Sequence, residues 1–109
     1  MNRRRYLLVL AALLLTARGA WAGNAEAKER TARTACLAGD YAKGVALLSE
    51  LFVDTMDPTY IYNQGRCFEQ NRRYEDAIAR FQEYLRAGKR LGKGEKADAQ
   101  RHIADCKEL

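Results

Sequence analysis

The sequence predicts an all-α domain of two helical hairpins plus a C-terminal capping helix, and two observations carry this prediction. The first is a helical pattern in the C-terminal half, where apolar residues recur at spacings that place them on one continuous helix face: Tyr74, Ala77, Ile78, Phe81, Tyr84 and Leu85. The second is that the residues 33 positions earlier are again all small or apolar: Tyr41, Gly44, Val45, Leu48, Leu51 and Phe52. Six matches at one offset indicate an internal repeat.

Residues 1–22 have the composition of a leader rather than of a folded domain. Three arginines precede an apolar run from Tyr6 to Ala17, and Ala20-Trp21-Ala22 supplies the small residues that a leader peptidase reads. We therefore expect a signal peptide cleaved after Ala22. The alternative is a retained membrane anchor, but spanning a bilayer takes about 20 apolar residues, and this run is shorter. The expected protein is periplasmic or secreted, with no stable membrane span once the leader is removed.

The net charge depends on that leader. The full chain has 19 basic and 14 acidic residues, a net charge of +5. Four of the 19 bases lie in the leader, so residues 23–109 keep 15 bases against 14 acids, a net charge of +1. A nucleic-acid-binding domain usually carries a strong basic excess, and the near balance here argues against that class.

Residues 23–109 are expected to form one helical repeat domain, and its first hairpin is the weaker copy. Asn24 can cap a first helix that ends at Gly39, a residue suited to a left-handed stop. The inward face of this helix would be Lys28, Ala32 and Ala35, and the long Lys28 side chain must reach past the apolar surface to water. The second helix of this hairpin carries the repeat that begins at Tyr41.

The second hairpin has clearer signals. Asp57-Pro58 is typical of a helix start, because the Asp side chain accepts free amide hydrogens and Pro lacks one. Ile61, Gly65 and Phe68 then share one face, and residues 71–73 turn the chain into the helix that begins near Tyr74.

A basic loop and a last helix complete the chain. The loop spans Gly88 to Gly94, and the helix is expected from about Glu95, with an apolar face formed by Ala99, Ile103 and Cys106. A repeat stack needs such a helix to cover its open end. The bases around the loop are read as a solvated connection.

These hairpins resemble tetratricopeptide repeats. Tyr60 to Phe68, with its small Gly65, is similar to the first helix of such a repeat, and Tyr74 to Phe81 is similar to the second. The repeat length of 33 is close to the 34 of that family. The chain departs from the pattern at Tyr84, where a small residue is usual, and in the loop after Gly88, which replaces a proline turn.

The resemblance implies a concave surface lined by the first helix of each repeat, where another protein or peptide, of the cell envelope, would bind. The residues that it places there are exposed residues of the second repeat and of the first: Tyr62, Arg66, Glu69, Gln70, Glu29, Arg33, Cys36 and Leu37. Tyrosine and arginine often anchor such interfaces. The alternatives are an ordinary solvated face or binding at the basic loop. A clamp for a C-terminal carboxylate is not expected, because only Asn63 matches it. Two repeats are fewer than the three that usually close a core, which favours a homodimer.

The sequence contains no enzyme motif and no sign of a cofactor. Asp98, His102 and Cys106 recur on one stripe of the last helix and are residue types that zinc accepts, but a fourth ligand is missing. The only serine, Ser49, has no nucleophile motif around it, and there is no Cys-x-x-Cys pair. We expect neither catalysis nor a bound metal.

Three cysteines remain after leader removal, and an oxidising compartment favours pairing of two of them. We expect a disulfide between Cys67 and Cys106, since the last helix should pack beside the second repeat, and a free Cys36. Pairing of Cys36 with Cys67 is the main alternative. An unpaired thiol also leaves an alternative function, that of a thiol-active or disulfide-linked envelope protein.

Overall fold

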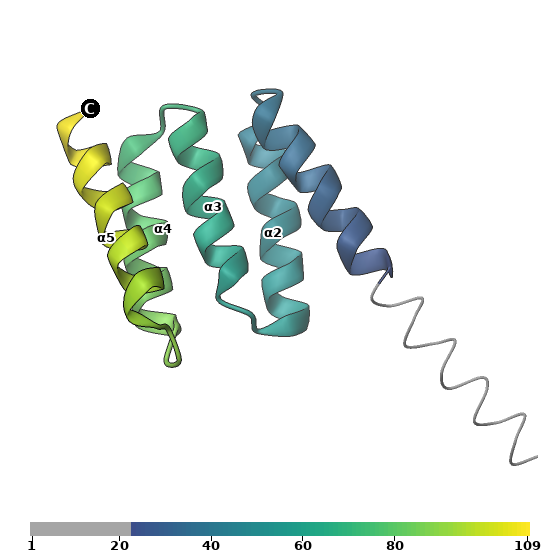
Figure 1. The fold of residues 1–109 in the computed structure, drawn as a ribbon. Coiled ribbons are helices and arrows are strands. Elements are labelled where there is room, and N and C mark those ends of the chain that lie inside the picture. Colours follow the sequence, from purple (N-terminus) through teal and green to yellow (C-terminus); the bar gives the residue numbers. More distant parts are fainter. Residues whose placement is uncertain (1–22) are drawn as a thin grey trace, which may run out of the picture.

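The computed structural model describes residues 23–109, and every regular element within them is a helix (Figure 1). Residues 23–37 are helical and are followed by four more helices: α2 (Tyr41–Thr55), α3 (Thr59–Gln70), α4 (Tyr74–Ala87) and α5 (Lys93–Glu108). The all-α prediction is confirmed. The predicted leader, residues 1–22, lies outside the described residues. Among the helices that are described, none is long and apolar enough to cross a membrane.

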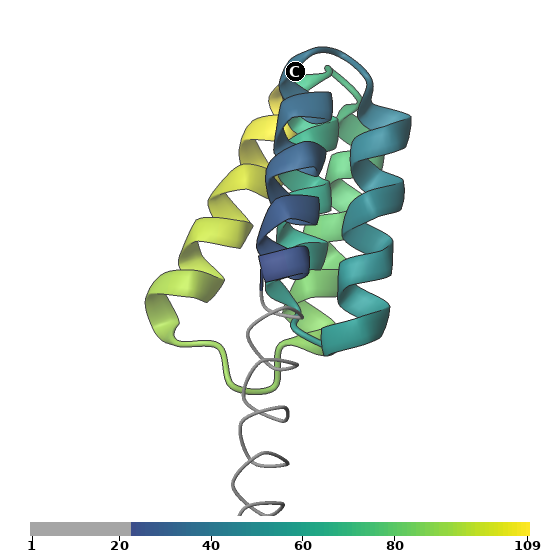
Figure 2. The same ribbon diagram turned by 90° about the vertical axis from the view of Figure 1, so that its right-hand side faces the viewer.

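Successive helices run antiparallel, and α3 is the central element (Figures 1 and 2). It packs against α2 and α4, and α5 packs in turn against α4. Side-chain contacts also join α3 to its neighbours on both sides, by a disulfide to helix 23–37 and by polar contacts to α5. Helix 23–37, α3 and α5 are therefore the elements that can share a binding surface.

The predicted repeat is present in the burial pattern. Gly44, Leu48 and Leu51 are the buried residues of α2, and their counterparts 33 positions later, Ala77, Phe81 and Tyr84, are the buried residues of α4. These side chains contribute to three small cores. The first hairpin builds one from Ala32, Leu48 and Leu51, and the other two lie among α3, α4 and α5.

The turns within the two hairpins also correspond. Gly39 adopts a φ of +90°, in the left-handed region that glycine tolerates. Arg72, which lies 33 positions later, has a φ of +59° in the equivalent turn between α3 and α4. The left-handed stop predicted at Gly39 is confirmed, and the second turn adopts the same conformation without a glycine.

Helix ends agree with the sequence to within two residues. The Asp57 carboxylate accepts the amide hydrogen of Thr59 at 2.9 Å, which is the capping role predicted at the start of α3. The last helix begins at Lys93 rather than near Glu95. The reason is that the Glu95 side chain accepts the amide hydrogen of Gly92 at 3.2 Å, so it caps the helix from its third position.

The first helix buries little apolar surface, as its sequence predicted. Its buried residues are Ala32, Ala35 and Cys36, and none of them is large. Lys28 is half-buried and reaches outward to pair with Glu50 of α2 at 3.2 Å. Small side chains let this helix approach α2 closely but contribute little hydrophobic free energy, at about 0.8 kcal/mol per buried methylene.

Candidate functional site

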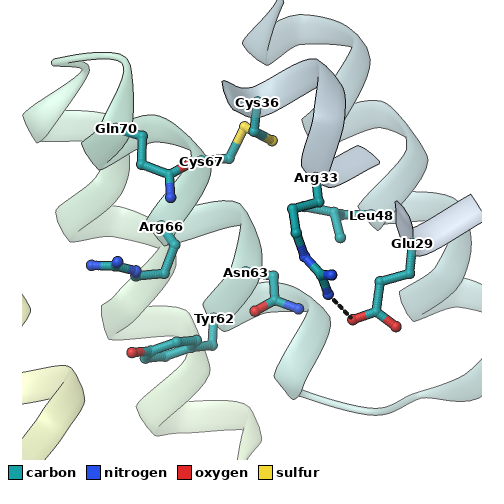
Figure 3. Close-up of a pocket in the computed structure, with 9 residues that line it drawn as sticks. All are labelled: Glu29, Arg33, Cys36, Leu48, Tyr62, Asn63, Arg66, Cys67 and Gln70. Atoms are coloured by element: carbon teal, nitrogen blue, oxygen red, sulfur yellow. Dashed lines mark ion pairs between the residues drawn. A yellow bond between two sulfur atoms is a disulfide. The ribbon is translucent and has the colours of Figure 1, made fainter. Parts of the chain in front are cut away.

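A groove lies on the molecular surface between helix 23–37 and α3 (Figure 3). Its volume is about 210 Å³. Residues of helix 23–37, α2 and α3 line it: Glu29, Arg33, Cys36, Leu48, Tyr62, Asn63, Arg66, Cys67 and Gln70. We call this feature the inter-repeat groove, because its two walls belong to different hairpins.

The α3 wall of the inter-repeat groove presents a row of polar side chains. Asn63, Arg66 and Gln70 follow one another at spacings of three and four residues, so they lie on one face of the helix. Figure 3 shows Asn63 pointing into the groove and Arg66 directed away from helix 23–37. Within residues 23–109 the side-chain amides of Asn63 and Gln70 have no hydrogen-bond partner, so both are free to bind a ligand.

The opposite wall carries one charge of each sign. Arg33 and Glu29 lie one turn apart on helix 23–37 and form an ion pair of 3.5 Å. The Arg33 side chain is 65% exposed, so this pair is well solvated and costs little to break. A ligand with an acidic or a basic group can therefore replace either partner.

The floor of the inter-repeat groove is apolar and consists of Leu48 and a disulfide. The disulfide joins Cys36 to Cys67, with a Cα–Cα distance of 5.2 Å. The predicted pairing of Cys67 with Cys106 is therefore wrong, and so is the prediction that Cys36 is free. Cys67 lies on the side of α3 that faces helix 23–37, whereas α5 approaches α3 from the other side.

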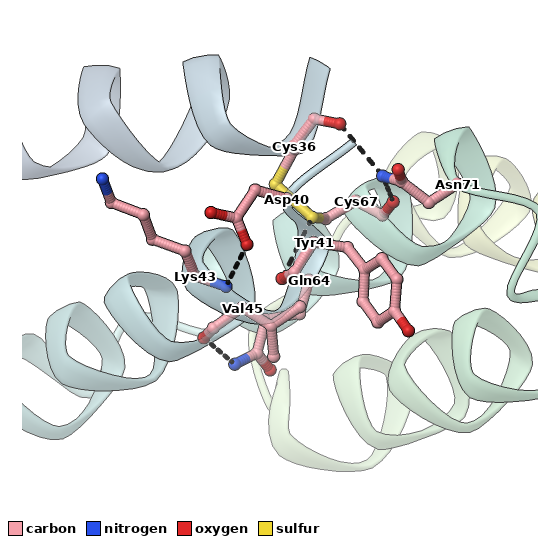
Figure 4. Close-up of a disulfide and its surroundings, with 8 residues drawn as sticks. All are labelled: Cys36, Asp40, Tyr41, Lys43, Val45, Gln64, Cys67 and Asn71. Carbon is pink, nitrogen blue, oxygen red and sulfur yellow. Dashed lines mark hydrogen bonds between the residues drawn. A yellow bond between two sulfur atoms is a disulfide. The ribbon is translucent and has the colours of Figure 1, made fainter. Parts of the chain in front are cut away.

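Close packing around the disulfide explains how it forms there (Figure 4). Gly44 of α2 lies directly beneath it, and a Cβ atom at that position would stand 2.3 Å from the Cys36 sulfur and 3.2 Å from the Cys67 sulfur. The Asn71 side chain donates hydrogen bonds to the backbone oxygens of Cys36 (3.0 Å) and Cys67 (2.8 Å). Gly44 thus leaves space for the disulfide, and the Asn71 amide binds the backbone of both helices beside it.

Of the eight residues predicted on the concave surface, four line the groove with side chains outside the core: Glu29, Arg33, Arg66 and Gln70. Cys36 lines it as part of the disulfide, and Leu37 does not line it. Tyr62 also borders it, but the prediction that Tyr62 is exposed is wrong. Its ring centroid lies 5.4 Å from that of Phe81 and 5.2 Å from that of Tyr84, and its hydroxyl donates to Asp98 of α5 at 2.5 Å. Burial and this hydrogen bond raise the pKa of Tyr62 to about 12.

Glu69 does not line the groove, contrary to prediction, because it faces α5. Its carboxylate contacts the Arg66 guanidinium at 2.5 Å and the Nδ1 atom of His102 at 2.9 Å. It also accepts a hydrogen bond from the Cys106 thiol at 3.4 Å. These contacts hold α5 against α3. The sequence could not predict them, because the spacing of residues along α5 does not indicate that Glu69 of α3 lies opposite.

The same contacts account for the stripe of potential zinc ligands on α5. Asp98 accepts the Tyr62 hydroxyl, while His102 and Cys106 both turn to Glu69. Within residues 23–109, no three His, Cys, Asp or Glu side chains gather around a common point that could hold a metal ion. The His102 ring instead stacks on Phe81 with centroids 5.1 Å apart.

The remaining thiol is buried. Cys106 is the free cysteine of the described residues, with an exposed fraction of 3%. Burial, followed by the hydrogen bond to Glu69, raises the pKa of this thiol to about 11. At neutral pH it is therefore protonated, and thiols in that form are poor nucleophiles.

The sequence did not predict three of the residues that line the groove, namely Asn63, Leu48 and Cys67, the last because its disulfide was predicted with Cys106. Asn63 was considered only for a carboxylate clamp, yet it lines the groove with a free amide. Leu48 was assigned to the core, and it belongs both to the core and to the groove floor. The helical register of α3 could have indicated Asn63, since it lies one turn before Arg66 and seven residues before Gln70.

No family model, curated protein or solved structure matches this chain.

Proposed function

We propose that this protein is an exported, non-catalytic adaptor that binds a segment of another protein in the inter-repeat groove, in the manner of a tetratricopeptide-like module of two repeats. The observation that carries the proposal is the composition of the groove. Free amides at Asn63 and Gln70 stand above an apolar floor of Leu48 and the disulfide. Amide side chains can pair with a peptide backbone through both their donor and their acceptor, while the floor accepts an apolar side chain.

The proposed compartment agrees with the cysteines. Disulfides form and persist in oxidising compartments, and Cys36 and Cys67 are joined. The charge and apolar pattern of residues 1–22 supports export by a signal peptide. A partner in the cell envelope follows from that location.

The alternative of a thiol-active protein is less well supported. Such a protein needs an accessible thiol with a lowered pKa, whereas Cys106 is buried and its pKa is raised. Catalysis by a serine nucleophile lacks support as well, since Ser49 accepts a hydrogen bond from Gln64 at 2.7 Å, while His102 is engaged by Glu69.

Site-specific photo-crosslinking tests the proposal. A photoreactive amino acid is placed at Gln70, which is exposed in the groove, and at Glu75 as a matched exposed position on α4. We expect a defined segment of one envelope protein to crosslink from position 70 and not from position 75. Asn63→Ala should weaken this crosslink while leaving the melting temperature within the range of surface substitutions.

Equal crosslinking from positions 70 and 75, or none from either, would show that the inter-repeat groove is a solvated surface. The basic loop is then the next site to test, since the exposed Lys89, Arg90, Lys93 and Lys96 form no ion pair within the part of the chain that is described.

A further inference from the structure

We infer that the inter-repeat groove is gated by redox state: the Cys36–Cys67 disulfide holds helix 23–37 in place, and its reduction by a dithiol releases this helix and dismantles the groove. The inference rests on the proposed function for its biological meaning, because it describes the regulation of the same groove. Its physical basis is independent of any partner.

The first argument is the weak packing of helix 23–37. The side chains that it buries are Ala32 and Ala35 together with the half-cystine Cys36. In contrast, α4 buries Phe81 and Tyr84. A helix that buries only small side chains has little hydrophobic free energy to hold it once a covalent link is removed.

The second argument is that few other contacts hold this helix. Lys28 pairs with Glu50 at 3.2 Å, but the Glu50 side chain is 58% exposed, and such solvated pairs contribute little. The Asn71 side chain donates to the backbone oxygen of Cys36 at 3.0 Å. That hydrogen bond lies beside the disulfide and depends on the same approach of the two helices.

The third argument is the tight space around the sulfur atoms. Cys36 Sγ stands where a side chain of Gly44 would begin, and the Cys67 sulfur lies close to the same point. Two separate thiols need van der Waals separation, which is wider than a bond. Reduction therefore pushes Cys36 and Cys67 apart at a place where the two sulfur atoms already lie close to the α2 backbone.

The rest of the molecule can survive the release. The two cores among α3, α4 and α5 have as buried members Ile61, Tyr84 and Ala99 in one, and Ala77, Phe81 and Cys106 in the other. None of these residues belongs to helix 23–37. Loss of this helix uncovers Leu48 and Leu51 of α2 but leaves both of these cores intact.

The reducing step is an ordinary exchange. A thiolate of the dithiol attacks one sulfur of the Cys36–Cys67 bond and forms a mixed disulfide, and the second thiol of the reductant then displaces the protein sulfur. The protein gains two electrons and two protons as two thiols, and the dithiol becomes a disulfide. Both cysteines line the groove but are buried, with exposed fractions of 5% and 1%, so the reductant reaches the bond when the weakly packed helix 23–37 opens locally. The reverse reaction makes the groove only after the chain has reached an oxidising compartment.

Hydrogen exchange of backbone amides, followed by mass spectrometry, tests this inference without a partner. The purified protein is compared with and without dithiothreitol at neutral pH. We expect exchange in residues 26–37 to accelerate by at least about 30-fold on reduction, the lower end of what a disulfide contributes. Exchange in α4 and α5 should change by less than about threefold, and they serve as the internal reference.

Two variants complete the experiment. Cys36→Ala/Cys67→Ala should show fast exchange in residues 26–37 with or without the dithiol. Cys106→Ala, which removes a buried cysteine outside the disulfide, should respond to the dithiol as the unaltered protein does. Unchanged exchange in residues 26–37 after reduction overturns the inference, and so does equal acceleration in all helices, since the disulfide would then stabilise the whole domain. Crosslinking from position 70 in the oxidised protein tests the proposed function separately, so each can fail alone.

Discussion

Gly65 is a point of close approach between the two helices of the second hairpin. A Cβ atom there would stand 2.8 to 2.9 Å from three carbons of the Phe81 ring. Phe81 is fully buried and its ring contacts both Tyr62 and His102, so it has no empty space to move into. The small residue that the sequence placed on the inward face of α3 is therefore required by the ring opposite it.

Gly65→Ala should lower the free energy of unfolding by about 1–3 kcal/mol, the usual cost of overpacking a core. Gly94→Ala is the matched control, because no atom lies within 4 Å of a Cβ at that position in the first turn of α5. It should be neutral or stabilising by a few tenths of a kcal/mol, since alanine favours the helix. Denaturant unfolding measures both, and equal effects of the two substitutions would contradict this account of Gly65.

At the level of elements, polar side chains join α5 to α3 in addition to the two apolar cores that these helices share with α4. Tyr62, Arg66 and Glu69 face Asp98, His102 and Cys106 across the contact. The corresponding space between helix 23–37 and α3 is the open groove. The side chains of α5 thus fill the space on one side of α3, whereas the space on the other side stays open as the inter-repeat groove.

The Tyr62–Asp98 contact predicts a dependence of stability on alkaline pH. The pKa of Tyr62 rises from 10.0 to about 12 on folding, so its contribution is complete below pH 10 and is lost as the pH rises toward 12. At neutral pH, Tyr62→Phe should cost about 0.5–1.5 kcal/mol for the lost hydrogen bond. The difference from the unaltered protein should shrink between pH 10 and 11.5.

Urea unfolding at several pH values measures that difference. Tyr74→Phe is the control, because the Tyr74 hydroxyl makes no hydrogen bond within residues 23–109. A difference between Tyr62→Phe and the unaltered protein that stays constant with pH would show that the hydroxyl has the same environment in the folded and unfolded chains.

The sequence predicted the elements better than the contacts between them. The apolar faces around Phe81 and Leu48 define the helices, because burial on one side imposes a period of 3.6 residues on the chain itself. The partner of Cys67 depends instead on which side of α3 each neighbouring helix approaches. Gly44 held the missing signal, since a glycine in a helix interior indicates the close approach of another group, and that group is the disulfide.

The same limit applies to the site. The family resemblance and helical register together put four residues on the predicted concave surface that also line the groove: Glu29, Arg33, Arg66 and Gln70. That they bind a protein stays a prediction. Helical register could not predict that Glu69 and the Tyr62 hydroxyl contact α5, because those contacts join residues about 33 to 37 positions apart.

At the scale of the whole array of helices, residues 23–109 expose few large apolar side chains. The large apolar side chains that are most exposed are Leu37, Val53, Met56 and Leu109. They lie at the ends of three helices rather than on one face, so they give a second copy no single surface to cover. The predicted homodimer stays a prediction, and these residues lend it no support.

The disulfide also decides how the molecule yields to a mechanical load. A pull applied between residue 23 and residue 109 enters helix 23–37 at its first residue. It reaches the disulfide at Cys36 after the helix has unwound. The tension then passes through the sulfur atoms into α3, and the 31-residue span that ends at Cys67 carries no load.

Single-molecule stretching should therefore give a shorter fully extended chain for the oxidised protein than for the reduced one. At about 3.3–3.6 Å per residue, the hidden span accounts for a difference of about 100 Å. An equal extension in the two states would mean that Cys36 and Cys67 are not joined. Under tension, the Cys36–Cys67 disulfide would thus shield α2 from the load, although neither cysteine belongs to that helix. Helix 23–37 would unwind before the other helices are stretched.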